Sequence, residues 1–521
     1  MSDDFTQAHS SLPERPEPYW RMTSQLGTFP SLEADLAVDV AIVGGGISGI
    51  SAAYLLAKEG QKVALIEADR LVNGTTGHTT AKITAQHDLI YNELISHIGV
   101  ERAKLYYEAS SDALHFMREL IKEEKMACDF TDEDAYLFTT TNWGVKKLED
   151  EYKAYQKLGI PGEWRDSIAL NLPVKAALVM NEQAQFHPIK YLAHLIKGIT
   201  DNGGKIFEQT VAIDIEGDSR PTVVTKSGAK ITAQQVFIAS HFPFFDGGGL
   251  YFSKMYADRS YVLAAKVKNE FPDGMYLSVD SPKRSLRYTM MDGEKLVLIG
   301  GEEHKTGQGI DMMYHYEALE QFGRELFPSL DIRFRWSAQD LITLDKIPYI
   351  GRISGMHSNV YVATGYRKWG MTNSTAAALL ITDLIMQRPN RYESLFSPSR
   401  FVADPSIKHF ISQNVDVAKQ LLQGKFDQHD RKPEDVKEDE GAIVSVNGKR
   451  AGAYRDKEGT LHLIDTTCTH LGCEVHWNHG DRSWDCPCHG SRFSYKGEVI
   501  EGPAKKPLML LKQASTKGDS T

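Results

Sequence analysis

Four of the five cysteines in this chain of 521 residues lie close together near its C-terminal end. One motif reads CTHLGC, from Cys468 to Cys473, and the other reads CPCH, from Cys486 to His489. Together, Cys-x-His and Cys-x-x-His supply two thiolates and two imidazoles. This ligand set is typical of a [2Fe–2S] cluster in which histidines hold one of the irons. A structural zinc site is the alternative, although zinc loops usually use Cys-x2–4-Cys spacing and would leave two cysteines unexplained.

Residues 468–489 resemble the cluster-binding loops of Rieske iron–sulfur proteins. The resemblance implies a role for six side chains: one iron held by Cys468 and Cys486, the other held by His470 and His489, and a disulfide between Cys473 and Cys488. It further matches Ser491 to a serine that hydrogen-bonds a bridging sulfide, and Gly502-Pro503-Ala504 to a proline loop. Phe493 replaces a tyrosine that donates a hydrogen bond to a cysteine sulfur in high-potential members. We therefore expect a potential below the top of the Rieske range of about −150 to +300 mV.

A second constellation lies near the N-terminal end, where the chain reads VDVAIVGGGISGISAAYLLAKEGQKVALIEAD. The pattern predicts a buried strand at 38–43, a glycine turn, a helix at 47–58 and a second strand that ends at Glu67. The G-x-G-x-x-G motif provides a tight turn, a close approach to a pyrophosphate and close packing of the helix, through Gly44, Gly46 and Gly49. An acid at the end of the second strand binds a ribose hydroxyl. The sequence therefore predicts a dinucleotide site.

Residues 71–84, LVNGTTGHTTAKIT, are rich in glycine and threonine and lack acids, which suits a loop that lines a phosphate or a flavin. Residues 38–84 resemble the D-amino-acid oxidase and glycine oxidase family of FAD-dependent oxidoreductases, and residues 345–383 resemble the second flavin-binding segment of that family. The resemblance implies further FAD contacts from Thr76, His78, Gly351, Gly370, Met371 and Thr372. Backbone N–H groups at a helix N-terminus would stabilise negative charge on the reduced ring.

The segment between the two flavin motifs predicts an antiparallel sheet at approximately 180–340, which matches the substrate domain of this family. Candidate residues for the wall of a substrate site are Arg259, Tyr261, Arg287, Tyr288, His304 and Trp336. Arg259, Tyr261 and Arg287 are the catalytic candidates, because an arginine can bind a substrate carboxylate through two hydrogen bonds. A structural arginine is the alternative for each position, and the sequence identifies no catalytic base.

The two resemblances, with the strand and helix patterns, imply an α/β plus all-β architecture: an FAD-binding Rossmann-like domain with an inserted antiparallel sheet, then a small antiparallel β Rieske domain. The expected divisions are a lead-in at 1–37, the flavin domain at 38–400, a helix at 407–424 within a linker region at 401–434, the Rieske domain at 435–512 and a tail at 513–521. A net charge of −10 argues against a nucleic-acid partner. No apolar run reaches the length of a membrane span or a signal peptide, so we expect a cytoplasmic protein.

These features predict a dehydrogenase that oxidises a small amine or amino acid with FAD and passes single electrons through one [2Fe–2S] cluster to an external carrier. One alternative is the reverse flow, in which a donor protein reduces the flavin through the cluster for a reductive or oxygenating reaction. Another alternative is a non-catalytic electron carrier or redox sensor.

His78 lies in a G-T-T-G-H string similar to the setting of covalent flavin attachment in some relatives of this family. One short string is a weak signal, so we predict that FAD is bound without a covalent link. Denaturing the protein in acid should release free flavin into the supernatant. Yellow flavin that stays on the precipitated polypeptide would contradict this prediction.

Overall fold

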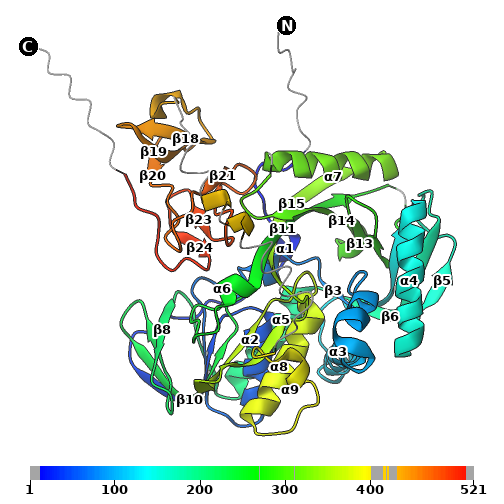
Figure 1. Cartoon of the computed structure of the whole chain (residues 1–521), viewed down its shortest axis with the longest axis horizontal. Coiled ribbons are helices and arrows are strands. Elements are labelled where there is room, and N and C mark those ends of the chain that lie inside the picture. The colour runs from blue at the N-terminus through cyan, green and yellow to red at the C-terminus, as the bar shows by residue number, and fades with distance from the viewer. Residues whose placement is uncertain are drawn as a thin grey trace, which may run out of the picture.

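The computed structural model describes residues 12–268, 270–309, 311–400, 415–417, 419–421 and 431–511. Figure 1 shows a blue-to-yellow α/β part below, a second sheet with helices above it, and orange-to-red C-terminal strands packed at the upper left. The fold class predicted from the sequence, α/β followed by a small antiparallel β domain, is confirmed.

The first sheet begins with the predicted glycine-turn strand. Its strands are β1 (Leu36–Val43), β2 (Val63–Ile66), β7 (Lys205–Phe207), β8 (Ala212–Glu216), β9 (Thr222–Thr225), β10 (Lys230–Ile238), β16 (Tyr349–Ser354) and β17 (His357–Thr364). The order is β16-β17-β10-β1-β2-β7, and the β8–β9 hairpin extends β10. The central strands run parallel, as their continuous apolar runs predict.

Three helices cover the glycine turn and its sheet: α2 (Ile47–Lys58), α5 (Pro188–Asp201) and α8 (Gly370–Ile385). α2 packs against both α5 and α8. It is almost entirely buried, because its sequence ISGISAAYLLAK is small and apolar on every face. A Cβ on Gly198 of α5 would lie 2.5 Å from the Tyr54 ring of α2, so glycine is needed for this close approach.

The second sheet is larger and mostly antiparallel. Its strands are β3 (Lys82–Ile83), β4 (Thr131–Thr139), β5 (Glu163–Arg165), β6 (Ala176–Gln185), β11 (Met255–Lys266), β12 (Met275–Ser278), β13 (Arg284–Met291), β14 (Glu294–Lys305) and β15 (Asp331–Thr343). The order is β15-β11-β14-β13-β12-β4-β6-β3, with β5 paired to β6. The sheet differs from the expected range of 180–340, because β3 to β6 start earlier and β7 to β10 belong to the first sheet. β10 ends in the buried run Val-Phe-Ile, which is suited to a parallel core.

The two faces of the second sheet have different neighbours. On one face, α7 (Met312–Leu326) packs Tyr316 and Leu319 against Tyr261 of β11. On the other face, Val262 of β11 and Trp336 of β15 join the main core of the nucleotide-binding part. Since side chains alternate along a strand, this arrangement determines which candidate residues can face a bound flavin.

The remaining helical elements connect these layers. They are α1 (Tyr19–Thr23), η1 (Thr75–His78), α3 (Tyr91–Glu123), α4 (Asn142–Leu158), α6 (Tyr251–Lys254), α9 (Glu393–Phe396) and η2 (Pro433–Asp435). α3 consists of two helices joined at Gly99, whose φ is 82°. The lead-in expected at 1–37 contains more structure than its polar sequence suggests. Trp20 is fully buried, and its indole N–H donates to Thr79 O at 2.7 Å.

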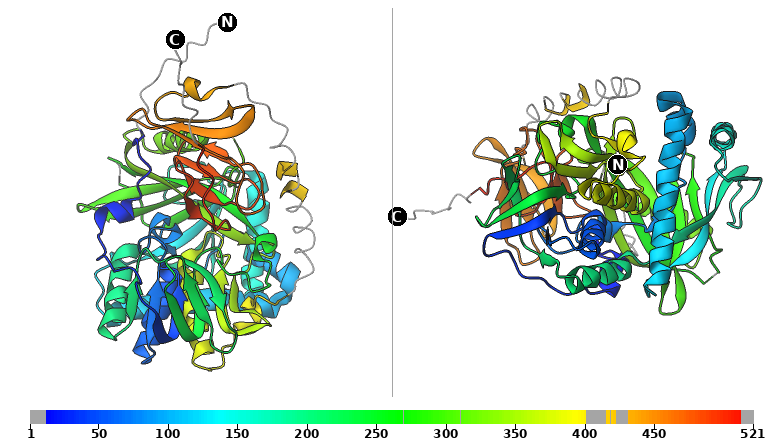
Figure 2. Two further views of the ribbon diagram at one scale, coloured as in Figure 1. Left: turned by 90° about the vertical axis from the view of Figure 1, so that its left-hand side faces the viewer. Right: turned by 90° about the horizontal axis from the view of Figure 1, so that it is seen from below.

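The C-terminal lobe contains two small antiparallel sheets, the orange one above the red one in the left view of Figure 2. The first comprises β18 (Glu440–Val446), β19 (Lys449–Arg455) and β20 (Leu461–Ile464), and the second comprises β21 (His476–Asn478), β22 (Ser483–Asp485), β23 (Arg492–Ser494) and β24 (Val499–Glu501). Asn447 and Gly448 both have positive φ between β18 and β19, as a two-residue Asn-Gly hairpin turn requires.

The helix expected at 407–424 falls largely outside the described residues, although residues 415–417 and 419–421 are helical. The tail expected at 513–521 lies outside them entirely. None of the helices in the described parts of the chain combines the length and apolar character that a membrane crossing requires.

Gly49, the third glycine of the G-x-G-x-x-G motif, provides a test of how closely α2 packs against the glycine turn. A Cβ on Gly49 would lie 2.0 Å from Gly44 O, so Gly49→Ala should destabilise the protein by about 1–3 kcal/mol and reduce the FAD content. Thermal unfolding and the ratio of flavin to protein absorbance measure the two effects. Gly27→Ala is the control, because a Cβ there has no neighbour within 4 Å. Equal flavin content in the two variants would contradict the role of Gly49.

Candidate flavin site and iron–sulfur centre

The glycine turn gathers backbone donors at the N-terminus of α2. Gly44 has φ +118°, and a Cβ there would lie 2.5 Å from Ala239 O. Gly46 caps α2, and a Cβ on it would lie 3.1 Å from Thr76 Oγ1. The Thr76 hydroxyl also accepts the N–H of Ile47 at 3.1 Å. The turn thus has backbone donors, a helix dipole and a hydroxyl at one point, as an anionic pyrophosphate requires.

Glu67 follows β2 directly and lies beside this turn. Its carboxylate accepts the N–H of Gly45 at 2.6 Å and the N–H of Asp69 at 3.0 Å. Burial raises the pKa of Glu67, and these backbone hydrogen bonds oppose the rise. A carboxylate held at the end of the second strand is suited to accept hydrogen bonds from ribose hydroxyls.

The second flavin segment meets the first at the N-terminus of α8. Thr372 Oγ1 donates to Thr84 O at 3.1 Å, and it lies 3.0 Å from His87 Nε2. Met371 is buried, whereas a Cβ on Gly370 would have no neighbour within 4 Å. Residues almost 290 positions apart in the chain are therefore brought together at an open helix end, which suits the pyrimidine side of a flavin.

Gly351 and His78 lie in different settings. Gly351 is within β16, and a Cβ on it would lie 3.2 Å from Pro398 Cδ. His78 ends η1; its Nδ1 lies 2.9 Å from Gly74 O, and its own carbonyl accepts the indole N–H of Trp336 at 2.8 Å. Burial lowers the pKa of His78 to about 4, so the imidazole is neutral at physiological pH.

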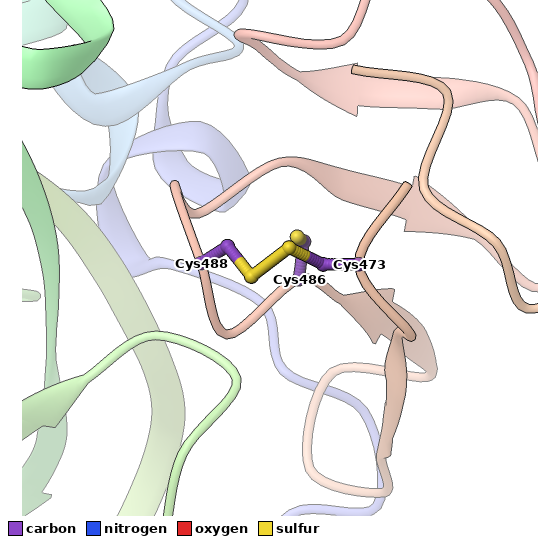
Figure 3. A group of neighbouring side chains, drawn as sticks. All are labelled: Cys473, Cys486 and Cys488. Atoms are coloured by element: carbon purple, nitrogen blue, oxygen red, sulfur yellow. A yellow bond between two sulfur atoms is a disulfide. The ribbon is translucent and has the colours of Figure 1, made fainter. Parts of the chain in front are cut away.

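The two cysteine–histidine loops lie together at the tip of the C-terminal lobe. Cys473 and Cys488 form a disulfide with a Cα–Cα distance of 6.5 Å. Figure 3 shows this bridge beside Cys486, and the three sulfurs lie within 4.8 Å of one another. The bridge uses two of these sulfurs, so this group does not offer three thiolates to one metal ion. Among the residues that the structure describes, the free buried cysteines are Cys128, Cys468 and Cys486.

The four expected ligands form two close pairs, one of cysteines and one of histidines. Hydrogen bonding from Cys486 lowers the pKa of the Cys468 thiol, so these two side chains are in contact. The rings of His470 and His489 lie 4.9 Å apart, centroid to centroid. Burial lowers the pKa of both histidines, to about 4 for His489, so both imidazoles are neutral and able to bind metal. Two thiols and two neutral imidazoles fit the donor set of a Rieske cluster.

The side chains around these ligands match in part those that the Rieske resemblance implies. Ser491 Oγ accepts the N–H of Ala504 at 3.0 Å and hydrogen-bonds the Cys468 sulfur. Phe493 is fully buried in the same core. Phe252 of α6, which belongs to the flavin-binding part, meets both cluster histidines edge to face, at 5.6 Å from the His470 ring and 5.8 Å from the His489 ring.

The substrate candidates divide between two places. Arg287 and Trp336 lie on the inner side of the second sheet, where Arg287 Nη1 donates to Ala81 O at 3.1 Å and the guanidinium lies 5.3 Å from the Trp20 ring. Tyr288 donates to Glu133 at 2.6 Å. Tyr261 lies on the α7 side, where its hydroxyl is 2.9 Å from His304 Nε2. These residues do not form one cluster.

Arg259 lies at the boundary between the flavin-binding part and the C-terminal lobe. Its guanidinium binds Ser337 Oγ at 2.7 Å and pairs with Asp481 of the lobe. Arg492 also pairs with Asp481, at 3.1 Å. Burial would raise the pKa of Asp481, but the two arginines outweigh burial and hold that pKa at about 2. The sequence alone did not reveal this role, because Asp481 lies 222 residues after Arg259 in an ordinary turn.

Two further contacts join the lobe to the flavin-binding part. Gln339 of β15 donates from Nε2 to Gly490 O at 3.0 Å, beside the expected ligand His489. The backbone carbonyl of Gln339 accepts the hydroxyl of Thr75 at 3.2 Å. Thr75 belongs to the predicted flavin-binding loop at 71–84, which we call the flavin loop. A Cβ on Gly490 would lie 2.2 Å from Ala257 Cβ, so glycine permits this contact. One residue therefore touches both the cluster loop and the flavin loop.

Arg335 of β15 joins three segments. It donates to Gly480 O of the lobe at 3.1 Å, and it also donates to Pro13 O at 2.5 Å and Glu14 O at 2.7 Å. The Glu14 carboxylate in turn pairs with Lys457 of the lobe. The N-terminal segment thus lies across the boundary between the two parts.

A flavin site and a cysteine–histidine centre on these folds define a flavin and iron–sulfur oxidoreductase. The chain belongs to the FAD dependent oxidoreductase family, whose model matches residues 39–384, and residues 428–514 match the Rieske [2Fe-2S] domain. The family binds FAD, and the Rieske domain binds a [2Fe–2S] cluster. The zinc alternative is therefore set aside.

Two curated relatives and one solved structure illustrate the similarity. A Rieske 2Fe-2S iron–sulfur protein of Bacillus subtilis is 52% identical over 495 residues, which cover 95% of this chain and 97% of the relative. Gamma-glutamylputrescine oxidoreductase of Escherichia coli is 22% identical over 391 residues, covering 72% of this chain and 90% of the relative. The crystal structure of glycine oxidase from Geobacillus kaustophilus matches 71% of this chain and 100% of its own with a TM-score of 0.62 at 20% identity, which shows a shared fold.

Phe493 offers a test of how the lobe sets the cluster potential. Phe493→Tyr adds a hydroxyl beside the cysteine sulfurs, and a donated hydrogen bond favours the reduced, more negative cluster. We predict a rise in reduction potential on the order of 50 mV, measured by an EPR-monitored redox titration. Phe493→Leu is the control, because it adds no donor and should leave the potential near that of the unmodified protein. A fall in the Tyr variant would contradict the prediction.

Proposed function

We propose that this protein oxidises a small amine or amino acid at the flavin site and delivers the electrons, one at a time, to an external carrier through the Rieske lobe. When bound, FAD accepts a hydride from a carbon next to nitrogen, and the cluster carries single electrons. The observation that carries the proposal is the Thr75–Gln339–Gly490 contact, since it connects the flavin loop to the cluster loop within one chain.

The residues that would hold the two groups remain predictions from the sequence, and the geometry above supports them. The proposed FAD contacts are Gly44, Gly46, Gly49, Glu67, Thr76, His78, Gly351, Gly370, Met371 and Thr372. The proposed cluster ligands are Cys468, His470, Cys486 and His489. Among the FAD contacts, Gly351 has the weakest support, because it packs against Pro398.

Arg287 and Lys82 supply positive charge for a substrate anion. Lys82 of β3 donates to Ser285 Oγ at 2.6 Å and to Tyr276 O at 3.2 Å, and it is close enough to Arg287 for the guanidinium to disfavour the charged amine. Among the described residues, neither side chain forms an ion pair with a carboxylate, and Arg287 Nε has no partner although the residue is 1% exposed. Two cations with unused hydrogen-bonding capacity suit a carboxylate ligand.

These surroundings also make the binding of an anionic substrate depend on pH. Burial, followed by repulsion from Arg287, lowers the pKa of Lys82 to about 7, and burial lowers the pKa of Arg287 to about 9. A bound carboxylate would favour the charged amine and raise the pKa of Lys82. Binding of an anionic substrate should therefore be tightest below pH 7 and weaken as pH rises above it, with proton uptake on binding near pH 8.

Arg259 and Tyr261 have other contacts in the structure, with Asp481 and His304 respectively. We therefore assign Arg259 to the docking of the lobe and retain Arg287 as the substrate-binding candidate. The carbon chemistry itself needs no catalytic base among these residues when an amine is bound in its neutral form, because the flavin accepts the hydride.

The first experiment mixes the protein anaerobically with a panel of amines, amino acids and NAD(P)H, and follows the flavin by absorbance and the cluster by EPR. A substrate should bleach the flavin and then produce the signal of a reduced Rieske cluster. Bleaching of the flavin without reduction of the cluster would refute the electron path. Reduction of the flavin only by an added electron donor would instead support the reverse flow.

Arg287→Met tests the substrate assignment. Loss of a charged hydrogen bond should raise the apparent Kd of an amino acid roughly 10- to 100-fold, as measured from the concentration dependence of anaerobic flavin reduction. The matching amine without a carboxylate should react as before. Arg333→Met is the control, because Arg333 is exposed on β15 and pairs only with Asp331 at 3.0 Å. Equal losses for both substrates would count against carboxylate binding.

A further inference from the structure

The flavin-binding part covers one side of the cluster tip and leaves another open. On the side of His489, Gln339 binds Gly490 O and Ala257 packs against Gly490. His489 is 8% exposed there. The buried pair of Arg259 with Asp481 fixes the lobe in this position. An electron carrier from outside therefore cannot approach the cluster along the His489 side.

The side of His470 has a different surface. The His470 ring also meets Phe252 of the flavin-binding part, at 5.6 Å, but His470 is half-buried rather than buried, and Leu471 next to it is 51% exposed. Thr469 Oγ1 donates to Lys506 O at 2.6 Å, which holds the segment with Lys505 and Lys506 beside the histidine loop. Both lysines are exposed. We call residues 469–471 together with Lys505 and Lys506 the His470 rim.

The charge of this rim is opposite to that of the whole chain. The net charge of the protein is −10, yet residues 466–473 and 502–507 contain two lysines and no acid. In the described parts of the chain, neither Lys505 nor Lys506 forms an ion pair. The rim thus combines an exposed apolar side chain, two free positive charges and a half-buried cluster ligand, which the Thr469–Lys506 hydrogen bond brings together.

We propose that the His470 rim is the docking surface for an acidic, one-electron carrier protein. The lysines would attract the acidic partner over several ångströms, and Leu471 would provide a dry contact next to the metal ligand. Small surfaces of this kind suit the brief complexes of electron-transfer proteins. In each encounter the reduced cluster loses one electron and the carrier gains one, and no bond is made or broken. Two encounters remove the pair of electrons from one substrate.

The direction of this transfer rests on the proposed function, but the surface can be tested without any substrate. The full-length holoprotein is reduced with dithionite, freed from excess reductant without oxygen, and mixed with one-electron oxidants of opposite charge. Ferricyanide is the anionic probe, and tris(bipyridine)cobalt(III) is the cationic probe. Freeze-quench EPR follows the loss of the reduced-cluster signal.

The double variant Lys505→Glu/Lys506→Glu should be oxidised by ferricyanide about tenfold more slowly at low salt and by the cobalt complex faster, because the sign of the local potential is reversed. High salt should remove both differences. The control is Lys437→Glu/Lys449→Glu, which makes the same change in net charge at exposed positions near the β18–β19 hairpin, at the other end of the lobe (Figure 1). The control should leave both rates unchanged.

Protein carriers test the class of partner. An acidic c-type cytochrome should accept electrons from the unmodified protein faster than a basic one, and this preference should be lost in the Lys505/Lys506 variant. Leu471→Gln should slow the acidic cytochrome while leaving ferricyanide nearly unaffected. Equal rates for both double variants, or a preference for the basic cytochrome, would overturn the proposal. Because flavin reduction by amines is measured separately, these outcomes do not depend on the substrate assignment.

Discussion

The carboxylate of Asp481, held between Arg259 and Arg492, determines how the two parts of this protein sit together. All three residues are at least nine-tenths buried by the contact, so their charges have little access to water. Removal of one member of a buried pair leaves an uncompensated charge and typically costs about 3–5 kcal/mol. The position of the lobe is therefore strongly specified, and the contacts of the cluster loops with β11 and β15 depend on it.

A fixed lobe separates the chemistry of the two sites. The flavin-facing side of the second sheet has Arg287 and Trp336, whereas the opposite side has Arg259 and supports the cluster loops. A single strand such as β15 can serve both, because its side chains alternate: Trp336 points to the flavin loop, and Ser337 points to Asp481. In the proposed function, the substrate site and the cluster therefore lie on opposite sides of one sheet.

Local sequence patterns predicted the parts of this protein in which neighbours in the chain are neighbours in space. The glycine turn at Gly44, the acid at Glu67 and the paired cysteine–histidine loops all belong to short motifs with a required spacing. The meeting of the flavin segments at 38–84 and 345–383 was predicted only through resemblance to a family, since nothing in either segment specifies the other. The separation of Arg259 from Arg287 could not be predicted, because both lie in similar amphipathic strands and only the partner lobe distinguishes them. The buried Trp20 was missed because a lone helical turn in a polar, proline-rich stretch gives no periodic signal.

Arg335 donates hydrogen bonds to Pro13, Glu14 and Gly480, which are far apart in the chain. Pro13 O lies 322 residues before Arg335 in the chain, and Gly480 O lies 145 residues after it. The contacts of this arginine are therefore complete only when the C-terminal lobe lies on β15. One buried side chain thus ties a segment near the start of the described residues to the lobe near their end.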